Sequence, residues 1–294
     1  MRIEDCTAVV FGGNGLLGRA IVRALRDAGA DVATPPRAEA DVTDEEQVAA
    51  VLDRRRPDLV VNATGYTAVD KAEDDRAAAF ILNRTAPALL CRQAARAGAA
   101  FVHYSTDFVF DGQNDAPYAE DAPTHPLNVY GESKLAGERA VLGECGNPRA
   151  LVLRTAWLFG PGKINFVEKM LTLGGERDEL RVVGDQIGSP SYTPDLAAYT
   201  LALLRKDARG LFHVVNSGHA SWCELASEAL AVAASECRVE SIASEEYPSR
   251  AARPGYSVLD TGAFTRATGV TPRPWVQALR EYVFQLHEVR GDAD

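Results

Sequence analysis

Residues 7–19 read TAVVFGGNGLLGR, an apolar run followed by a glycine-rich turn, with glycines spaced at 12, 15 and 18, at the start of a helical pattern. The apolar run is typical of a buried strand, and the spacing of apolar residues from 16 to 29 indicates an amphipathic helix. Gly12 permits the tight turn between them, Gly15 lets backbone N–H groups approach a pyrophosphate, and Gly18 allows close helix packing. We therefore predict a dinucleotide site, although the first gap is one residue wider than usual and a turn without a ligand is the alternative.

The rest of the first half alternates in the same way. Its apolar runs predict strands at 31–34, 58–64, 100–106 and 149–159, and its helical patterns predict helices at 44–56, 72–98 and 130–143. Continuous apolar strands separated by helices indicate βαβ units. We predict an α/β fold with a Rossmann-type doubly wound parallel sheet, covered by helices on both faces.

The second half is less regular. Helices are expected near 165–174, 195–206 and 274–288, strands at 181–185 and 210–216, and a polar loop at 186–193, with a Pro-, Arg- and Ser-rich stretch before the last helix. Such segments often form a substrate lobe over the carboxyl edge of a sheet. We expect an NAD(P)-binding domain at 1–155 plus about 191–216, and a smaller α/β substrate lobe at 156–190 and 217–294.

Composition excludes several classes of protein. The chain of 294 residues is 46% hydrophobic with a formal net charge of −10, which argues against nucleic-acid binding. The five cysteines are scattered, so we expect reduced thiols and neither a disulfide framework nor a zinc site. The histidines have no metal-ligand spacing, and we expect no metal. The N-terminus does not have the pattern of a signal peptide and no apolar run is long enough to span a membrane, which predicts a cytoplasmic protein.

The choice of cofactor depends on the segment TPPRAEADVTD at 34–44. An acid after the second strand would bind the ribose 2′-hydroxyl of NAD, whereas a base would accept the 2′-phosphate of NADP. Arg37 follows this strand, and Arg19 follows the third glycine. These cations favour NADPH, while Glu39 is the competing acid that keeps NADH possible.

A second constellation lies in NVYGESKLAGE at 128–138. Tyr130 and Lys134 are one helical turn apart, so the ammonium can lower the pKa of the phenol and stabilise the tyrosinate left after proton donation. Strand 100–106 ends in Thr106, whose hydroxyl can polarise a ketone at the carboxyl edge of the sheet, and Asp107 follows it. An isolated Tyr–Lys pair is usually a solvated helix face. Combined with the glycine loop, the Tyr130–Lys134 pair instead predicts the reduction of a ketone by hydride transfer.

These motifs resemble the extended short-chain dehydrogenase/reductase family, and more narrowly its dTDP-4-dehydrorhamnose reductases. The narrower likeness rests on TAVDKAE (67–73), STDFVFDG (105–112), PLNVYGESKLAGE (126–138), RTAWLF (154–159) and DQIGSP (185–190). It implies NADPH-dependent reduction of the C4 ketone of a dTDP-4-dehydro-6-deoxyhexose, with the rhamnose precursor as first substrate. Another dTDP-deoxysugar in antibiotic biosynthesis, or a non-catalytic NADP-binding regulatory subunit, is the alternative.

The residues and the resemblance together give the expected site. The catalytic residues are Tyr130, Lys134, Thr106 and Asp107, of which the resemblance implies that Asp107 helps to reprotonate the product. The substrate residues are Thr67, Val69, Thr106, Asp107, Tyr130, Trp157 and Arg253. The cofactor residues are Gly12, Asn14, Gly15, Leu16, Leu17, Gly18, Arg19, Arg37, Asp41, Val42, Ala63, Thr64, Gly65, Ser105, Tyr130 and Lys134. Val69 and Leu16 as core, Asp41 as a helix cap and Trp157 as a core residue are the structural alternatives.

The chain also departs from the family pattern. Paired arginines before a proline are reduced to AARPGYS (251–257), which leaves only Arg253 for a diphosphate. Some relatives have a glutamate soon after the third glycine that joins a magnesium-bridged dimer, where this chain has Arg19 and Ala20. We therefore expect no such metal and either a monomer or a homodimer. The loop NATGYTAVD (62–70) differs just before Thr67, which leaves the hexose open.

Overall fold

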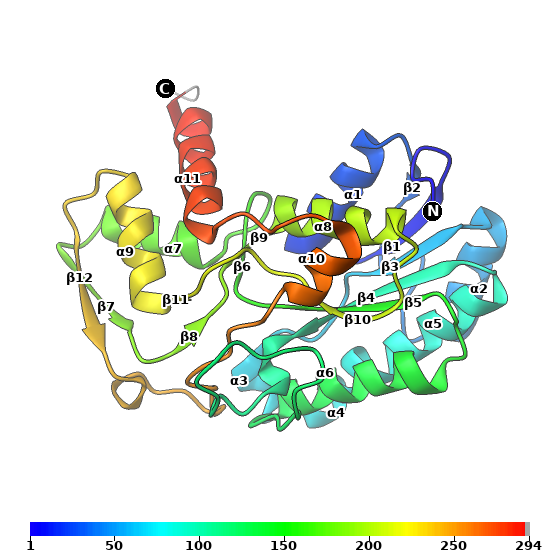
Figure 1. Ribbon diagram of the computed structural model, residues 1–294, viewed down its shortest axis with the longest axis horizontal. Helices are drawn as coiled ribbons and strands as arrows, with labels where there is room; N and C mark the ends of the chain where they lie inside the picture. Colours follow the sequence, from blue (N-terminus) through cyan, green and yellow to red (C-terminus); the bar gives the residue numbers. More distant parts are fainter. Residues whose placement is uncertain (292–294) are drawn as a thin grey trace.

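Six parallel strands form the central sheet in the order β10-β5-β4-β3-β1-β2 (Figure 1). The structure, a computed structural model, describes residues 1–291. All six strands pair in parallel, and β2 and β3 lie on opposite sides of β1, so the strand order reverses between β1 and β3 and leaves a crevice at their carboxyl ends. The strands are β1 Thr7–Phe11, β2 Asp31–Ala33, β3 Leu59–Asn62, β4 Ala100–Thr106, β5 Ala150–Thr155 and β10 Gly210–His213.

Helices cover both faces of this sheet, as predicted (Figure 1). One face packs against α1 Leu16–Asp27, α8 Thr193–Arg205 and α10 Gly262–Thr268. The other face packs against α2 Glu45–Arg55 and α5 Ala86–Arg96, and α6 Val129–Arg139 lies beside the segment that leads into α5. Central strands such as β4 are buried along their whole length, which explains why their sequences are apolar runs without alternation.

A smaller lobe lies at one end of the molecule (Figure 1). Its core joins α7, α9 and α11 to the parallel pair β7–β12. Short strand pairs, β6 with β9 and β8 with β11, connect it to the main sheet. The bounds are β6 Leu158–Phe159, α7 Phe166–Gly174, β7 Glu179–Val183, β8 Ile187–Gly188, β9 Ser191–Tyr192, β11 Ala220–Ser221, α9 Trp222–Val232, β12 Arg238–Ile242 and α11 Trp275–Gly291.

Two predicted elements are interrupted. The expected helix 72–98 is divided into α3 Val69–Ala72, α4 Arg76–Phe80, a π-helical turn Ile81–Thr85 and α5, because the Asp75 side chain caps a new helix by accepting from Ala78 N at 3.2 Å. The expected strand 149–159 is divided into β5 and β6. Trp157 lies between them with φ 47°, a left-handed conformation that a strand cannot accommodate.

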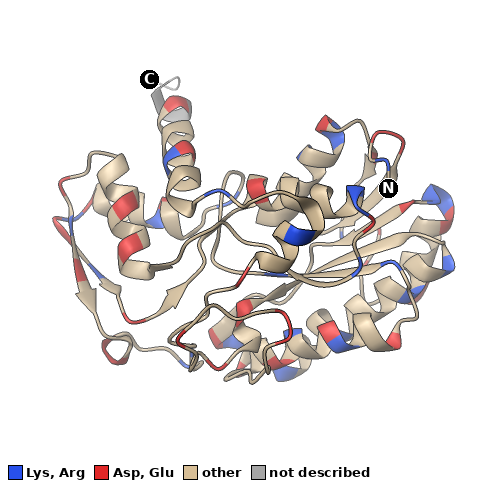
Figure 2. Ribbon diagram, viewed as in Figure 1, with Lys and Arg blue, Asp and Glu red and all other residues tan. Residues whose placement is uncertain are grey.

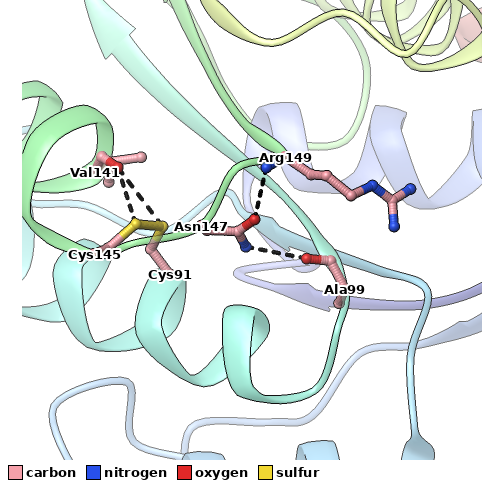
Figure 3. The surroundings of a disulfide bond; sticks show 6 residues. All are labelled: Cys91, Ala99, Val141, Cys145, Asn147 and Arg149. Atoms are coloured by element: carbon pink, nitrogen blue, oxygen red, sulfur yellow. Dashed lines mark hydrogen bonds between the residues drawn. A yellow bond between two sulfur atoms is a disulfide. The ribbon is translucent and has the colours of Figure 1, made fainter.

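The expectation of five reduced thiols is wrong for two of them. Cys91 on α5 and Cys145 form a disulfide, with their Cα atoms 5.8 Å apart (Figure 3). A π-helical turn, Ala140–Glu144, continues α6 and places Cys145 against α5. Nearby, Asn147 fixes the chain that follows by donating to Ala99 O at 3.0 Å and accepting from Arg149 N at 2.9 Å (Figure 3). Cys6, Cys223 and Cys237 are free.

Charged residues of both signs lie mainly on helices and loops, whereas most strands of the central sheet carry none (Figure 2). Buried strands exclude charge because removing an ion from water is costly unless it is paired. Among the described residues, none of the helices is long and apolar enough to cross a membrane.

Helix α6 crosses the turn Ile81–Thr85 at very close range. A Cβ atom at Gly137 would lie 2.0 Å from Asn83 O, and one at Gly131 would lie 2.2 Å from Phe108 O. Any side chain at these positions would push α6 away from the edge of the sheet. Glycine at both positions therefore allows α6 to pack directly against the backbone of Asn83 and Phe108.

We expect Gly137→Ala to lower the free energy of unfolding by about 2–3 kcal/mol, since the methyl group meets backbone that cannot move aside. Urea denaturation measures this change. The matched control is Gly143→Ala, where no atom of the described residues beyond its own stretch of helix lies within 4 Å of the added Cβ and a change within about 0.5 kcal/mol is expected. Equal stability of both variants would contradict the tight crossing.

Candidate active site

A cavity of about 690 Å³ opens at the carboxyl edge of the central sheet. It is lined by the glycine loop after β1, the loop after β3, the end of β4, the start of α6 and the segment after β5. Fifteen of the predicted site residues lie on its wall, so segments distant in the sequence meet in one place. They are Gly12, Gly15, Leu16, Leu17, Ala63, Thr64, Gly65, Thr67, Val69, Ser105, Thr106, Asp107, Tyr130, Lys134 and Trp157.

The glycine loop has the backbone geometry that the sequence predicted. Gly12 has φ 80°, and a Cβ there would lie 2.6 Å from Ala63 O. A Cβ at Gly18 would lie 2.1 Å from Gly12 O, so its predicted role is packing and it does not line the cavity. Gly15 precedes α1 with no side-chain cap, and the first turn of α1 has no acidic residue. This helix end therefore offers backbone N–H groups that suit an anionic phosphate.

The loop after β3 is tied to α6 through Asn83. The Asn83 side chain accepts from Tyr66 N at 2.8 Å and donates to Tyr66 O at 3.0 Å and to Ser133 Oγ at 2.9 Å. Asn62 at the end of β3 accepts from Thr64 N and Thr64 Oγ1 at 3.0 and 2.6 Å. These bonds hold the loop 63–67 against the helix that carries Tyr130 and Lys134.

Asn128 sets the start of α6. Its Oδ1 accepts from Gly131 N at 2.8 Å, and its Nδ2 donates to Ala252 O at 2.7 Å. Tyr130 consequently lies in the first turn, partly exposed to the cavity, and Lys134 lies one turn deeper with 5% of its surface exposed. The Lys134 ammonium donates to Tyr104 O of β4.

Asp107 is buried at the end of β4 beside Thr106. Thr106 Oγ1 donates to Asp107 Oδ1 at 3.0 Å, and Ser257 Oγ from the C-terminal segment donates to Asp107 Oδ2 at 2.6 Å. Burial raises the pKa of Asp107 to about 6, and the two hydroxyl hydrogen bonds offset part of this effect. A carboxyl that titrates this close to neutrality is suited to proton exchange.

The pKa of Tyr130 lies above its ordinary value in this structure, not below it as the Tyr–Lys spacing predicted. Burial dominates and raises the pKa of Tyr130 to about 12, a polar contact with Thr106 lowers it in part, and the Asp107 charge raises it. Burial also lowers the pKa of Lys134 to about 8, against the opposing influence of the Glu138 charge. At neutral pH the phenol is protonated and the amine is mostly charged, which are the states that an acid and its cationic neighbour need.

Trp157 and Trp222 both line the cavity and lie against one another. Their rings stack at 3.6 Å between centroids with an interplanar angle of 5°. Trp222 was not among the predicted site residues, because no helix was predicted for the segment directly after β10. A local signal existed: Ser221 and Glu224 form a capping box at the start of α9, and the S-x-x-E spacing is visible in the sequence. No comparable signal marks Lys163, which also lines the cavity.

Several predicted cofactor residues lie outside this cavity. Arg37 is largely exposed and pairs with Asp41 at 3.3 Å, and Arg19 Nε donates to Asn14 O at 3.2 Å. Asp41 accepts from Thr43 N and Oγ1, which holds its pKa below the usual range, while Asp44 caps α2. Val42 is in the core. Contact of these residues with a cofactor stays a prediction.

Arg253 also lies outside it. Arg253 Nη2 donates to Asp70 Oδ2 at 3.0 Å, and the residue lines a neighbouring cavity of about 890 Å³. Trp222 is part of the wall of both cavities. Among the described residues, no cluster of three or more His, Cys, Asp or Glu side chains could hold a metal ion.

The parallel sheet with a glycine loop, a Thr at one strand end and a Tyr–Lys pair on the adjacent helix defines an extended short-chain dehydrogenase/reductase fold. Residues 6–288 match the family described as RmlD substrate binding domain, and the chain belongs to this family. The family resemblance and the Rossmann-type fold predicted from the sequence are thereby confirmed.

Relatives of known name cover nearly the whole chain. It is 43% identical over 279 residues to a probable dTDP-4,6-dihydroxy-2-methyloxan-3-one 4-ketoreductase of Streptomyces antibioticus, covering 93% of each chain. It is 41% identical over 280 residues to dTDP-4-dehydrorhamnose reductase of Streptomyces griseus, covering 93% of this chain and 91% of the relative. The crystal structure of dTDP-4-dehydrorhamnose reductase from Bacillus anthracis in complex with NADP is similar with a TM-score of 0.91 and 33% identity, covering 96% of this chain and 99% of that one.

The raised pKa of Asp107 predicts a pH-dependent loss of stability. Its pKa is about 6 in the folded protein against an ordinary value of 3.8 for an aspartate, so the folded state loses stability as pH rises through this interval. Asp107→Asn removes this titration. The free energy of unfolding of the variant, measured relative to that of the wild type, should therefore rise by up to about 3 kcal/mol between about pH 4 and about pH 8. Urea denaturation at both pH values measures this gain.

Asp111 provides a control of opposite sign. Hydrogen bonds from Gln113 N and the Tyr118 hydroxyl lower its pKa, so its ionised form stabilises the fold above the unfolded pKa. Asp111→Asn should therefore lose stability relative to the wild type as pH rises. The same trend in both variants would contradict the assignment of Asp107.

Proposed function

We propose that this protein is an oxidoreductase that uses NADPH to reduce the C4 ketone of a dTDP-4-dehydro-6-deoxyhexose. The first candidate reaction converts dTDP-4-dehydro-L-rhamnose to dTDP-L-rhamnose. The observation that carries the proposal is the meeting of Thr106, Tyr130 and Lys134 with the glycine loop on one cavity. The intact set also weighs against a purely regulatory, non-catalytic role.

The residues of the glycine loop fit a dinucleotide. Gly12 has no side chain, so the loop passes close to Ala63 without filling the space for a pyrophosphate. The uncapped start of α1 offers backbone N–H donors to it. NADPH is the first choice because the B. anthracis relative is described in complex with NADP, and NADH is the second. We propose Arg37 and Arg19 as the cations for a 2′-phosphate, although both lie outside the cavity wall.

The roles of the catalytic residues follow from their protonation states. A nicotinamide cofactor held by the glycine loop would supply the hydride that C4 of the sugar accepts. Tyr130, protonated at neutral pH, donates its proton to the oxygen that gains charge as the ketone is reduced. The charged Lys134 stabilises the resulting tyrosinate, and the Thr106 hydroxyl orients the ketone. Asp107 is placed beside Thr106 to take part in returning a proton to the site.

Three further residues of the cavity wall, Thr67, Val69 and Trp157, are candidates for the substrate side. We propose that they contact the sugar nucleotide. Arg253 is paired with Asp70 and would contact a diphosphate only from the adjoining cavity. We further propose the division into a cofactor domain, 1–155 plus about 191–216, and a substrate lobe, 156–190 and 217–294. A cytoplasmic location and a monomer or homodimer complete the proposal.

A second substrate deserves testing because the relatives differ in their named reactions. The S. antibioticus relative is described as a 4-ketoreductase of another dTDP-sugar, and a Streptomyces niveus relative, 40% identical over 275 residues, as dTDP-4-keto-6-deoxy-D-glucose reductase. These enzymes share the reacting C4 ketone and differ in the sugar. The stereochemistry of the product therefore separates the candidates.

Incubation with dTDP-4-dehydro-L-rhamnose and NADPH, followed by product NMR, tests the proposed function. We expect consumption of NADPH and a single C4 epimer, and a higher kcat/KM with NADPH than with NADH. Turnover of only another dTDP-4-keto sugar would favour the second substrate. Loss of all reductase activity in protein that still binds NADPH would favour a regulatory role.

Tyr130→Phe should lower kcat by about 10²–10⁴-fold, because the proton donor is lost while the ring is kept. Absorbance of NADPH measures turnover, and a fluorescence titration checks that the cofactor still binds. Tyr118→Phe is the control, since it removes a hydroxyl that donates to Asp111 away from the cavity wall. Near-normal turnover by Tyr130→Phe would refute the acid assignment.

A further inference from the structure

Glu138 is a buried charge that the proposed chemistry does not use. It lies one helical turn after Lys134 on α6, and 3% of its surface is exposed. Its Oε1 accepts from Ser105 Oγ at 2.5 Å and from Arg154 Nε at 2.9 Å, and its Oε2 accepts from Arg154 Nη2 at 2.7 Å. The carboxylate is thus fixed by charge-assisted hydrogen bonds on both oxygens.

Among the described residues, few other ionised groups lie around Lys134, Glu138 and Arg154. Burial lowers the pKa of His103 on β4 well below its usual value and lowers the pKa of His213 on β10 to about 3, so both imidazoles are neutral at physiological pH. Tyr130 is protonated, and Tyr104 contributes its carbonyl oxygen. Asp107 lies on the Tyr130 side, at the end of β4. The Glu120 side chain accepts from His213 N beyond Arg154, and its carbonyl oxygen accepts from Arg154 Nη1.

Helix α6 and strand β5 therefore bury two cations, Lys134 and Arg154, around one anion, Glu138. Arg154 is neutralised directly by its two hydrogen bonds to Glu138. Among the described residues no carboxylate forms a salt bridge with Lys134, which donates to a backbone carbonyl, so burial favours its neutral form. The remaining attraction from Glu138 acts at a distance of one helical turn and opposes that loss of charge.

We propose that Glu138 is a positioning residue for the Tyr130–Lys134 pair, which keeps Lys134 charged inside the protein while Arg154 and Ser105 hold the carboxylate in place. The kinetic consequence rests on the proposed reductase function, because a charged Lys134 is needed to stabilise the tyrosinate. The competing explanation is an ion pair that only fastens α6 to β5. Both explanations predict that loss of Glu138 destabilises the fold, and only ours predicts a change in the titration of Lys134.

The test compares the wild type with Glu138→Gln, which removes the charge and keeps the shape. The rate at which acetic anhydride acetylates Lys134, measured by mass spectrometry across pH, reports the fraction of neutral amine without any substrate. We expect the pKa of Lys134 to fall by about one unit in the variant. The basic limb of the kcat profile should move to lower pH by a similar amount.

Arg154→Met is the matched variant of opposite sign. It removes the neutralising cation and leaves the Glu138 charge uncompensated, so the pKa of Lys134 should rise. The double variant Glu138→Gln with Arg154→Met removes both members of the ion pair, and its Lys134 should titrate between the single Glu138→Gln variant and the wild type. If either single variant fails to fold, the double variant still tests the direction.

An unshifted titration of Lys134 in Glu138→Gln, or in the double variant, would overturn the inference, even if kcat fell uniformly at all pH values. A shifted titration in protein that reduces no dTDP-4-keto sugar would support the inference and refute the proposed function. The two failures are therefore distinguishable in one set of proteins.

Discussion

The site depends on the close crossing of α6 over the turn that precedes α5. Gly137 and Gly131 lie where a methyl group would meet Asn83 O and Phe108 O. Because the helix can approach this closely, the Tyr130 phenol reaches Thr106 at the end of β4, and the Lys134 ammonium reaches Tyr104 O. Asn83 then ties the loop after β3 to the same helix. One steric constraint thus aligns three separate segments of chain.

Burial then sets the protonation states of the aligned groups. Lys134 and Asp107 are buried and Tyr130 is partly enclosed beside the cavity, and in each case burial disfavours the charged form. Their pKa values are consequently about 12 for Tyr130, about 8 for Lys134 and about 6 for Asp107. At neutral pH the acid therefore keeps its proton, while the two neighbouring groups lie within reach of titration. The polar network of Glu138, Arg154 and Ser105 supplies the only buried acidic partner on this helix among the described residues.

Local pattern predicted the central sheet and most of the cavity wall, since apolar runs and glycine spacing are encoded within a few residues. Long-range contacts were not visible in this way. The pairing of Cys91 with Cys145, the ion pair of Arg253 with Asp70 and the exposure of Arg37 depend on tertiary packing. Trp222 was not predicted because the sequence after β10 looked irregular and α9 was not recognised in it, although its capping box is visible in the sequence. The opposite direction of the Tyr130 pKa shift arose from burial, which helical spacing cannot report.

The stacked indoles of Trp157 and Trp222 lead to a constraint on specificity. Trp157 has a left-handed backbone, and a Cβ at Gly188 would lie 2.5 Å from its ring, so the position of the ring is fixed from behind. Trp222 presses on that ring and also forms part of the second cavity. A substitution at Trp222 would reshape both compartments together. Recognition of the reacting end of a ligand and of whatever extends into the second cavity cannot be adjusted independently at this position.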